Sequence, residues 1–446
     1  MKKTLLLATL LLAALAASAQ DTLTVAQMRE DFNYMMEQYE RIHPNPTWSL
    51  GGERYNELKR QTLERLDRPM TQLDFWRVIA QWNQHFDGHT RVGFPQMVPQ
   101  MPEGMMVFPP MSIVQYRDGQ LRFSSYEGMP DSLRGCKITA VDGHRVGEIV
   151  DSIMPYVSHE SGAYMNATIL RSFSFYYNLF YGYSRQMTFR YMRDGAEKTV
   201  RLDRRTLYEW LVQVGDHGSI GSTGPREVPW HFKLFPEQDI ALFEFNTCGP
   251  YNRLGQFDSV VSLCIDSINR CGIGHLFVDL SHNGGGWDMF CQYFLCHIGG
   301  LPDTAVVMDV TSTEGGTVAG TEEKRVRMSF HPKQPLYGGR LYFIQSRFTY
   351  SAPIMLVNTV KRYGLGTLVG EETGGLTTTY SWPIPVTLPN SGLKFHCSDR
   401  QYRHLGTTGP RGVLPDIPLE IGYKYLFCSF TAEELQQMIE MSNSKR

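Results

Sequence analysis

Several features that mark other classes of protein are missing from this sequence. After the first 19 residues, no stretch approaches the ~20 consecutive apolar residues that a membrane-spanning helix needs. The eight cysteines include no C-x-x-C pair, which argues against a cysteine zinc site. The phosphate-binding pattern G-x-x-x-x-G-K-[ST] and the dinucleotide-binding pattern G-x-G-x-x-G are also absent. We therefore expect no cofactor, no metal ion and no membrane anchor.

An excess of one charge is missing too. The chain has 43 Lys and Arg residues against 45 Asp and Glu residues. Domains that bind nucleic acid usually carry a basic excess, so we expect no nucleic-acid partner. The length of 446 residues is sufficient for two or three domains with a substantial core.

The amino-terminal segment has the three parts of a secretory signal peptide. Two lysines precede an apolar run, which ends in the small-x-small pattern A-S-A. We assign residues 1–19 to this signal peptide and expect an exported protein, periplasmic or secreted. In an oxidising compartment Cys291 could pair with Cys296, or Cys264 with Cys271, although buried thiols are the simpler interpretation.

Beyond the signal peptide the pattern of apolar residues changes twice. Residues 20–95 carry apolar side chains at helical spacing, starting with Met28 and Phe32, and we predict a helical domain. Residues 96–225 begin with a Pro- and Met-rich linker and continue with short strand patterns separated by turns. Residues 226–446 combine buried-strand runs with helical patterns, which predicts an α/β domain.

Three glycines follow a buried-strand pattern in the segment V-D-L-S-H-N-G-G-G-W, residues 278–287. Glycine lets the backbone turn sharply and present its N–H groups outward. Such N–H groups can bind an anion or a developing oxyanion. A flexible turn is the alternative interpretation. We name Gly284, Gly285 and Gly286 as candidate oxyanion donors.

A serine stands at the start of a predicted helix in S-R-F-T-Y-S-A-P-I-M-L-V-N-T-V, residues 346–360. Pro353 suits the first helical turn, where its missing N–H is not needed. Ser351 could simply cap this helix. Alternatively its hydroxyl is a nucleophile at the positive end of the helix, with the Ala352 N–H directed at the same point. A serine hydroxyl needs a nearby base for that role.

Four sequence blocks, in the same order, resemble the C-terminal processing (tail-specific) peptidases and the tricorn protease core. They are D-L-S-H-N-G-G-G, T-Y-S-A-P-I-M-L-V-N, L-V-G-E-E-T-G-G and G-V-L-P-D-I, within residues 226–420. The resemblance implies an α/β fold with a crotonase/ClpP-like ββα core, serine peptidase chemistry and a preference for unstructured polypeptide ends. The segment G-C-K-I-T-A-V-D-G-H-R-V-G-E-I-V resembles the middle of the family's PDZ-like domain. The expected domains are a signal peptide (1–19), an N-terminal helical domain (20–95), a linker with a degenerate PDZ-like domain (96–225) and a peptidase core (226–446).

The resemblance also suggests which residue is the base. One branch of the family uses a lysine just after the Gly-Glu block, but Leu376 stands at that place here. The tricorn-like branch uses a histidine from far upstream, and F-D-G-H-T nominates His89. An imidazole with an ordinary pKa of about 6.5 suits this role at neutral pH. His85 lies four residues before His89, but the segment lacks the glutamate of H-E-x-x-H, so we do not expect zinc.

Two departures from the family concern the group that orients the imidazole. Gly88 stands where tricorn has a serine, and Gly409 stands where tricorn has a glutamate. A carboxylate in this role fixes the imidazole tautomer and stabilises the imidazolium. The candidate substitutes in this chain are Asp87, Glu371, Glu372 and Asp399.

We therefore predict an exported serine-type peptidase that hydrolyses peptide bonds in peptides or unfolded proteins. In this hypothesis Ser351 attacks the carbonyl, His89 carries the proton, and N–H groups of the three glycines and of Ala352 hold the oxyanion. The alternative is a catalytically inactive peptidase homologue that keeps the cleft to bind peptide or glycan. The missing orienting groups and the 12% aromatic content would suit that alternative.

Overall fold

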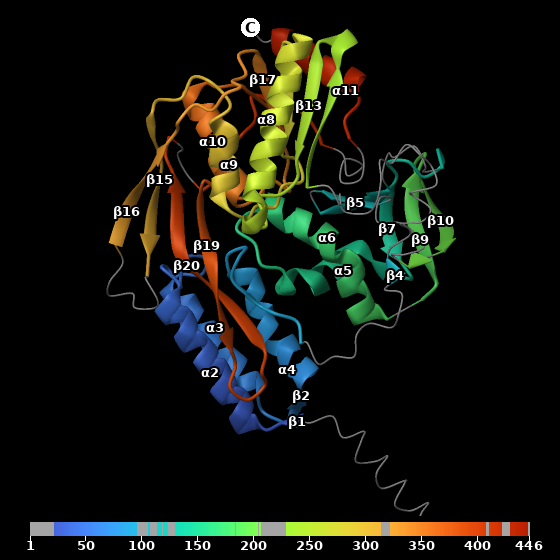
Figure 1. The fold of residues 1–446 in the computed structure, drawn as a ribbon. Helices are drawn as coiled ribbons and strands as arrows, with labels where there is room; N and C mark the ends of the chain where they lie inside the picture. Colours follow the sequence, from blue (N-terminus) through green and yellow to red (C-terminus); the bar gives the residue numbers. More distant parts are fainter. Residues whose placement is uncertain are drawn as a thin grey trace, which may run out of the picture. The chain divides into compact units, whose positions relative to one another are not determined.

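The structure of the protein is a computed structural model (Figure 1). It describes residues 22–95, 106–107, 114–117, 119–123, 130–182, 184–203, 205–206, 229–313, 322–406, 410–421 and 429–444. The predicted signal peptide lies outside these residues. Among them, we find no helix with the length and apolar character needed to span a bilayer. The chain divides into a first unit (Met1–Met101, Ser312–Glu322, Tyr380–Arg400) and a second unit (Pro102–Thr311, Glu323–Thr379, Gln401–Arg446).

The first unit begins with helices. Its early elements are β1 (Thr22–Leu23), α2 (Val25–Ile42), α3 (Gly52–Arg65), β2 (Met70–Thr71), α4 (Gln72–Ile79) and the 3₁₀ helix η1 (Ala80–His85). α2 starts at Thr24, whose side chain accepts a hydrogen bond from the Gln27 N–H while the Gln27 side chain accepts from the Thr24 N–H. This reciprocal cap fixes the start of the helix. Met28, Phe32 and Tyr39 are buried on one face of α2, as their spacing predicts.

Later segments of the chain complete the first unit. The strands are β3 (Arg91–Val92) and the larger parts of β19 (Thr378–Thr387) and β20 (Lys394–His404). β20 is hydrogen-bonded to β19 and pairs antiparallel with β3, where Phe395 lies opposite Val92. The Phe395 ring packs 5.6 Å from the Phe86 ring, so the core of this unit joins residues from both ends of the sequence.

An antiparallel sheet with helices forms the first part of the second unit. Its strand order is β10-β9-β7-β6-β5, and β8 pairs with β7. The elements are β5 (Val114–Arg117), β6 (Gln120–Phe123), β7 (Lys137–Val141), β8 (His144–Arg145), α5 (Val146–Ile153), η3 (Met154–Tyr156), α6 (Gly162–Tyr181), β9 (Gln186–Arg193) and β10 (Ala196–Asp203), with β4 (Met106–Val107) paired to β11 (Arg205–Thr206). Buried residues of these strands and helices form one cluster, which also includes Phe348 from a distant segment.

A second sheet organises the rest of this unit, in the order β12-β13-β14-β17-β18-β21. Every neighbouring pair is parallel except β12 with β13. The elements of this part are β12 (Trp230–Phe235), η4 (Pro236–Gln238), β13 (Ile240–Phe245), η5 (Tyr251–Arg253), α8 (Leu254–Cys271), β14 (His275–Asp279), α9 (Asp288–Leu295), β17 (Arg340–Gln345), α10 (Ala352–Tyr363), β18 (Thr367–Gly370), β21 (Ile417–Pro418) and α11 (Ala432–Ser444). β15 (Thr304–Ser312) and β16 (Glu322–Ser329) are paired with each other outside this sheet.

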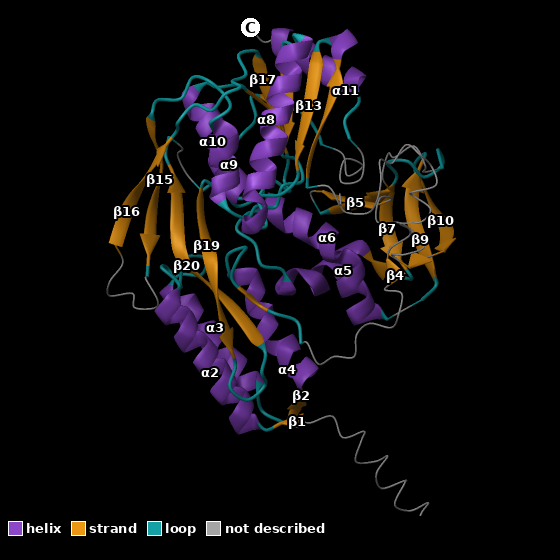
Figure 2. Cartoon of the chain, in the orientation of Figure 1, coloured by secondary structure: helices purple, strands orange, loops and turns teal. Residues whose placement is uncertain are grey.

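Alternate side chains of this sheet pack on its two faces, as strand geometry requires. Phe243 and Val278 lie in the buried cluster with α8, α9 and α10. Leu242 and Phe277 lie in the cluster with α11. Figure 2 shows α8, α9 and α10 side by side, with α9 between the other two. The parallel order brings the carboxyl ends of β14 and β17 together, and both strands lead into the segments singled out from the sequence.

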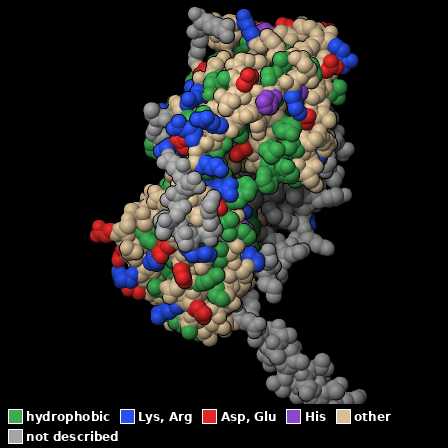
Figure 3. All heavy atoms as spheres, turned by 60° about the vertical axis from the view of Figure 1, so that its left-hand side comes forward, with side chains coloured by type: hydrophobic (Ala, Val, Ile, Leu, Met, Phe, Trp, Pro, Cys, Tyr) green, Lys and Arg blue, Asp and Glu red, His purple; other side chains and the backbone are tan. Residues whose placement is uncertain are grey.

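The mixed α/β class predicted from the sequence is confirmed. The PDZ-like assignment, the separate N-terminal helical domain and the three boundaries between the four expected segments stay predictions. Cys264, Cys271, Cys291 and Cys296 are free thiols in this structure. On the face drawn in Figure 3, acidic and basic side chains are interspersed, in keeping with the balanced charge of the sequence.

Candidate active site

Ser351 lies at the point where the loop after β17 enters α10. It occupies the N-cap position of α10, but its side chain makes no capping hydrogen bond. Its backbone has φ 66° and ψ −125°, a region that side-chain-bearing residues rarely adopt. Residues held in such sparsely populated regions cost on the order of 1–3 kcal/mol each and cluster at functional sites. Helix capping therefore does not explain this serine.

The loop before Ser351 is tied to the segment that carries the glycines. The Ser346 hydroxyl donates to the carbonyl of Ser281. The Thr349 hydroxyl donates to the carbonyl of Leu280 at 2.9 Å. The Tyr350 N–H donates to the carbonyl of Asn283 at 3.0 Å. These bonds bring the two candidate segments together, as the sequence analysis requires of an oxyanion loop and its nucleophile.

Two of the three glycines have no space for a side chain. A Cβ built on Gly285, where φ is +107°, would lie 2.5 Å from the Ser351 Cβ and 3.0 Å from its Oγ. A Cβ on Gly286, where φ is +132°, would lie 2.1 Å from the Cys248 carbonyl oxygen. The backbone can approach the serine this closely only because these residues are glycines. The alternative of a merely flexible turn does not account for this packing.

The backbone N–H groups near Ser351 differ in whether they already donate a hydrogen bond within the protein. The Gly285 N–H donates to Asn283 Oδ1 at 3.0 Å and is therefore occupied. Among the described residues, we find no acceptor for the N–H groups of Gly284, Gly286 and Ala352. Ala352 is the first residue of α10, where N–H groups have no partner within the helix. Of the four predicted donors, Gly284, Gly286 and Ala352 thus remain available to an oxyanion.

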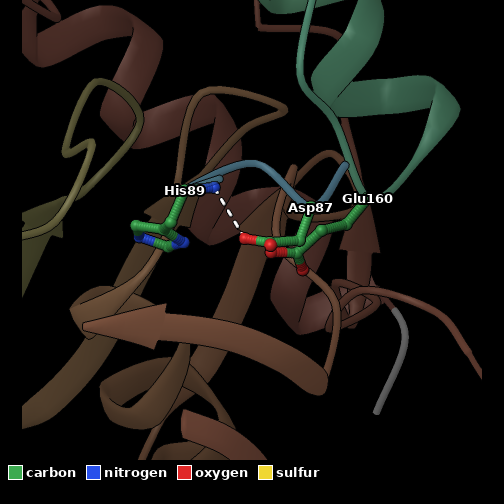
Figure 4. Close-up of side chains that lie close together, drawn as sticks. All are labelled: Asp87, His89 and Glu160. Atoms are coloured by element: carbon green, nitrogen blue, oxygen red, sulfur yellow. Dashed lines mark hydrogen bonds between the residues drawn. The ribbon is translucent and has the colours of Figure 1, made fainter. Parts of the chain in front are cut away.

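His89 lies in the first unit, beside a buried carboxylate. Asp87 Oδ1 accepts the His89 N–H at 2.8 Å, as Figure 4 shows. The same carboxylate accepts from the Ser398 hydroxyl at 2.9 Å and lies 3.2 Å from His43 Nε2. Burial alone would raise the pKa of Asp87, but His43, His89 and Thr90 bring it down to about 2. Asp87 therefore stays ionised and fixes the backbone from which the His89 ring projects.

The His89 ring is hydrogen-bonded to the backbone of Tyr380. Burial lowers the pKa of His89, whereas the Asp87 charge and a hydrogen bond to the backbone of Tyr380 raise it, and the net direction is down. A hydrogen bond that raises a histidine pKa is one that favours the imidazolium. The Tyr380 backbone can thus fix the tautomer, which is the task usually given to a carboxylate. Neither Tyr380 nor His43 was named from the sequence, because no local pattern marks their long-range contacts.

The other proposed orienting acids have partners of their own. Glu371 Oε2 and Oε1 accept from Arg347 Nε and Nη2, both at 3.1 Å. Glu372 Oε1 accepts the Gly412 N–H at 2.8 Å. Burial raises the pKa of Asp399, which lies 3.4 Å from the Arg400 Nε. Glu371 and Glu372 therefore hold loops of the second unit, whereas Asp399 belongs to the first unit.

Leu376 marks the place where the other branch of the family has its lysine. It is 8% exposed and lines a cavity of about 550 Å³ in the second unit. The cavity wall is completed by Glu160, Ser161, Gly162, Ala163, Glu372, Pro410 and Arg411. Two lysines elsewhere in the chain, Lys361 and Lys394, are the alternatives to the missing lysine. Lys361 pairs with Asp416 at 3.2 Å, and Lys394 donates to Thr387 Oγ1 at 2.7 Å. Both lysines thus have partners of their own, and the base expected from the sequence is still His89.

One protein family and several solved structures are similar to this chain. Residues 243–419 match the model of Peptidase family S41. Mature CPAF complexed with lactacystin matches with a TM-score of 0.63 and 12% identity, over 94% of this chain and 99% of that chain. A CPAF mutant matches with a TM-score of 0.65 and 12% identity, over 94% and 98%. The photosystem II D1 C-terminal processing protease has a TM-score of 0.47 and 16% identity, over 88% and 93%.

No curated protein matches the sequence. At 12% identity the likeness to CPAF shows that the fold is shared across nearly the whole chain. The family match covers the glycine segment, Ser351 and the Gly-Glu block. Residues 243–419 therefore match peptidase family S41, and this match supports a serine-type peptidase.

Proposed function

We propose that this protein is an exported peptidase that cleaves peptides or unfolded proteins, with Ser351 as the nucleophile and His89 as the base. The observation that carries the proposal is the backbone of Ser351. A serine held at φ 66° against a glycine, with its side chain not used for capping, is a residue whose hydroxyl is placed for another purpose.

The chemistry follows from the groups described above. The Ser351 Oγ attacks the substrate carbonyl carbon as its proton passes to a neutral His89 ring nitrogen. The carbonyl oxygen becomes an oxyanion, for which the N–H groups of Ala352, Gly284 and Gly286 are the candidate donors. The protonated imidazole then gives its proton to the leaving amine, and water repeats the sequence to release the acyl group. His89 and Ser351 belong to different units, so the proposal requires that they meet in the active enzyme.

Two single substitutions test this mechanism. Ser351→Ala and His89→Ala should each lower the hydrolysis of an unfolded protein substrate by roughly 10³–10⁶-fold, because coupled catalytic residues fail as one unit. Ser259→Ala and His144→Ala are matched controls, since both residues are exposed in the second unit, and they should leave the rate unchanged. Added imidazole should restore part of the His89→Ala activity if the ring acts as a base.

A labelling experiment separates the proposal from its rival. A fluorophosphonate probe should form an adduct on Ser351 that peptide mapping by mass spectrometry can locate. An inactive homologue would instead bind peptide or glycan saturably and return it unchanged. Equal turnover by the parent and both variants would reject the Ser/His mechanism.

Export is a separate part of the proposal and rests on the leader pattern of residues 1–19. The mature protein should be recovered outside the cytoplasm with Gln20 at its amino terminus. Intact-mass measurement of that fraction tests this, and a chain that retains its leader and stays with the cytoplasm would contradict it.

A further inference from the structure

Tyr350, the residue immediately before Ser351, is held on three sides. Its hydroxyl donates to Glu160 Oε1 at 2.6 Å. Its ring stacks on the Tyr164 ring with centroids 3.9 Å apart and planes 11° apart. Its N–H donates to the carbonyl of Asn283 at 3.0 Å, in the segment that leads to the glycines. The residue is 2% exposed, so its position is determined by these protein contacts.

Glu160 comes from a part of the chain that precedes Tyr350 by 190 residues. It lies just before α6, and the same Oε1 accepts a second hydrogen bond from Thr379 Oγ1 at 2.7 Å. The neighbouring Ser161 donates to the carbonyl of Gly374 at 2.6 Å. Phe348 of the same loop is buried in the cluster formed by α5, α6 and their sheet. The start of α6 therefore contacts the nucleophile loop directly.

We propose that Glu160 is a positioning residue, which acts on Ser351 through Tyr350. This inference rests on the proposed function of Ser351. A strained backbone persists only where its surroundings over-determine it, and Tyr350 is the residue through which that constraint reaches Ser351. A carboxylate makes shorter and stronger hydrogen bonds than a neutral acceptor, so Glu160 fixes the direction of the phenol as well as its distance.

The consequence concerns turnover more than substrate binding. Without the carboxylate, the Tyr350 hydroxyl loses its acceptor in a buried position, and the loop of residues 346–350 shifts to find another. A misplacement of about 1 Å at a reacting group can cost about 10²-fold in rate. Substrate contacts elsewhere would remain, so KM should change much less than kcat.

The test is a set of matched variants with kcat and KM measured separately. Glu160→Ala should lower kcat by about 10–100-fold with little change in KM. Glu160→Gln retains an acceptor oxygen and should recover part of this loss. Tyr350→Phe removes only the hydroxyl. The double variant Glu160→Ala/Tyr350→Phe should have a kcat no lower than that of the poorer single variant, because both changes remove the same hydrogen bond.

Glu197→Ala is the matched control. Glu197 also accepts a hydrogen bond from a hydroxyl, Thr139 Oγ1 at 2.6 Å, but at an exposed site on the antiparallel sheet. This variant should keep the parental kcat. If Glu160→Ala misfolds, Tyr350→Phe decides, since it keeps the ring and its stack on Tyr164.

The rate of fluorophosphonate labelling at Ser351 distinguishes the two proposals. A parent that is labelled quickly, with Glu160→Ala and Tyr350→Phe labelled more slowly, supports the positioning role. Equal labelling rates and equal kcat in all three would overturn this inference and leave the proposed function intact. A parent that takes no label at Ser351 would overturn both.

Discussion

At the scale of single residues, the backbone of Ser351 is the feature that links stability to function. Its φ of 66° places it among the few side-chain-bearing residues with positive φ in the described chain. The conformation directs the residue toward the glycine loop, where a Cβ at position 285 would meet both its Cβ and its Oγ. Strain kept at such a point is evidence that selection has favoured the position of the hydroxyl over stability.

Ser351→Gly should therefore make the protein more stable and inactive. Glycine adopts this conformation without strain, whereas alanine does not, so Ser351→Gly should be more stable than Ser351→Ala by about 1 kcal/mol. Urea unfolding of the two inactive variants measures this difference in stability. Because both variants lack the hydroxyl, its loss does not contribute to the difference. A Ser351→Gly variant less stable than Ser351→Ala would show that the backbone is unstrained in solution.

The pKa of His89 leads to a prediction for the pH dependence of the rate. Burial is the largest influence on the His89 pKa and lowers it from its ordinary value of 6.5, against the opposing effect of Asp87. A general base acts in its neutral form, so the rate should rise with pH through this lowered pKa. The acid limb of the kcat/KM profile should thus have its midpoint below pH 6.5. A midpoint at or above 6.5 that is lost in His89→Ala would show that Asp87 outweighs burial.

At the scale of elements, the glycine loop after β14 (residues 284–286) both connects two elements and holds the candidate oxyanion donors. Its register is fixed by Cys248, whose N–H donates to the Gly285 carbonyl at 3.0 Å and whose carbonyl accepts the Trp287 N–H at 2.6 Å. This bridge fixes the backbone on both sides of Gly286. β14 and β17 are parallel neighbours, so the loop and the nucleophile leave the sheet at the same edge.

Gly285→Ala should damage this element severely. The added Cβ would be 2.5 Å from the Ser351 Cβ, at a φ of +107° that alanine rarely adopts. We expect hydrolysis to fall by at least about 10²-fold, because the loop and the serine must move apart. Gly255→Ala on α8 is the control, since an added Cβ there would have no atom within 4 Å apart from its chain neighbours and the backbone of its own helix. That change should leave activity unchanged and stabilise the helix by up to about 1 kcal/mol, as thermal unfolding can show.

At the scale of the whole molecule, the sequence predicted local elements well and long-range contacts poorly. The end of α8 at Gly272, with φ 67°, and the buried strands β13, β14 and β17 follow from patterns within a few residues. The contacts of Asp87 with Ser398 and of Glu160 with Tyr350 join residues 311 and 190 positions apart. No single-sequence pattern encodes such pairs, because each depends on how separate segments pack. The family resemblance nominated Ser351 and His89, which stay predictions, but it could not indicate the residues that hold them.

Asp31 holds together segments of the first unit that are distant in sequence. The residue is 0% exposed, and its carboxylate accepts the N–H groups of Asn390 and Ser391, both at 2.8 Å. Asp31→Ala would leave two N–H groups without a charged acceptor, which should cost on the order of 3 kcal/mol. Asp67→Ala, at an exposed position in the same unit, should cost little.

The effect should be local to the first unit, and hydrogen exchange by mass spectrometry can show it. In Asp31→Ala, amides of α2 and of residues 388–400 should lose protection, while those of β13 and β14 keep theirs. Hydrolysis should fall with the protection of the first unit, because His89 belongs to that unit and the proposed mechanism needs its ring. Full activity in a variant whose first unit has lost protection would remove His89 from the mechanism and leave Ser351 in need of another base.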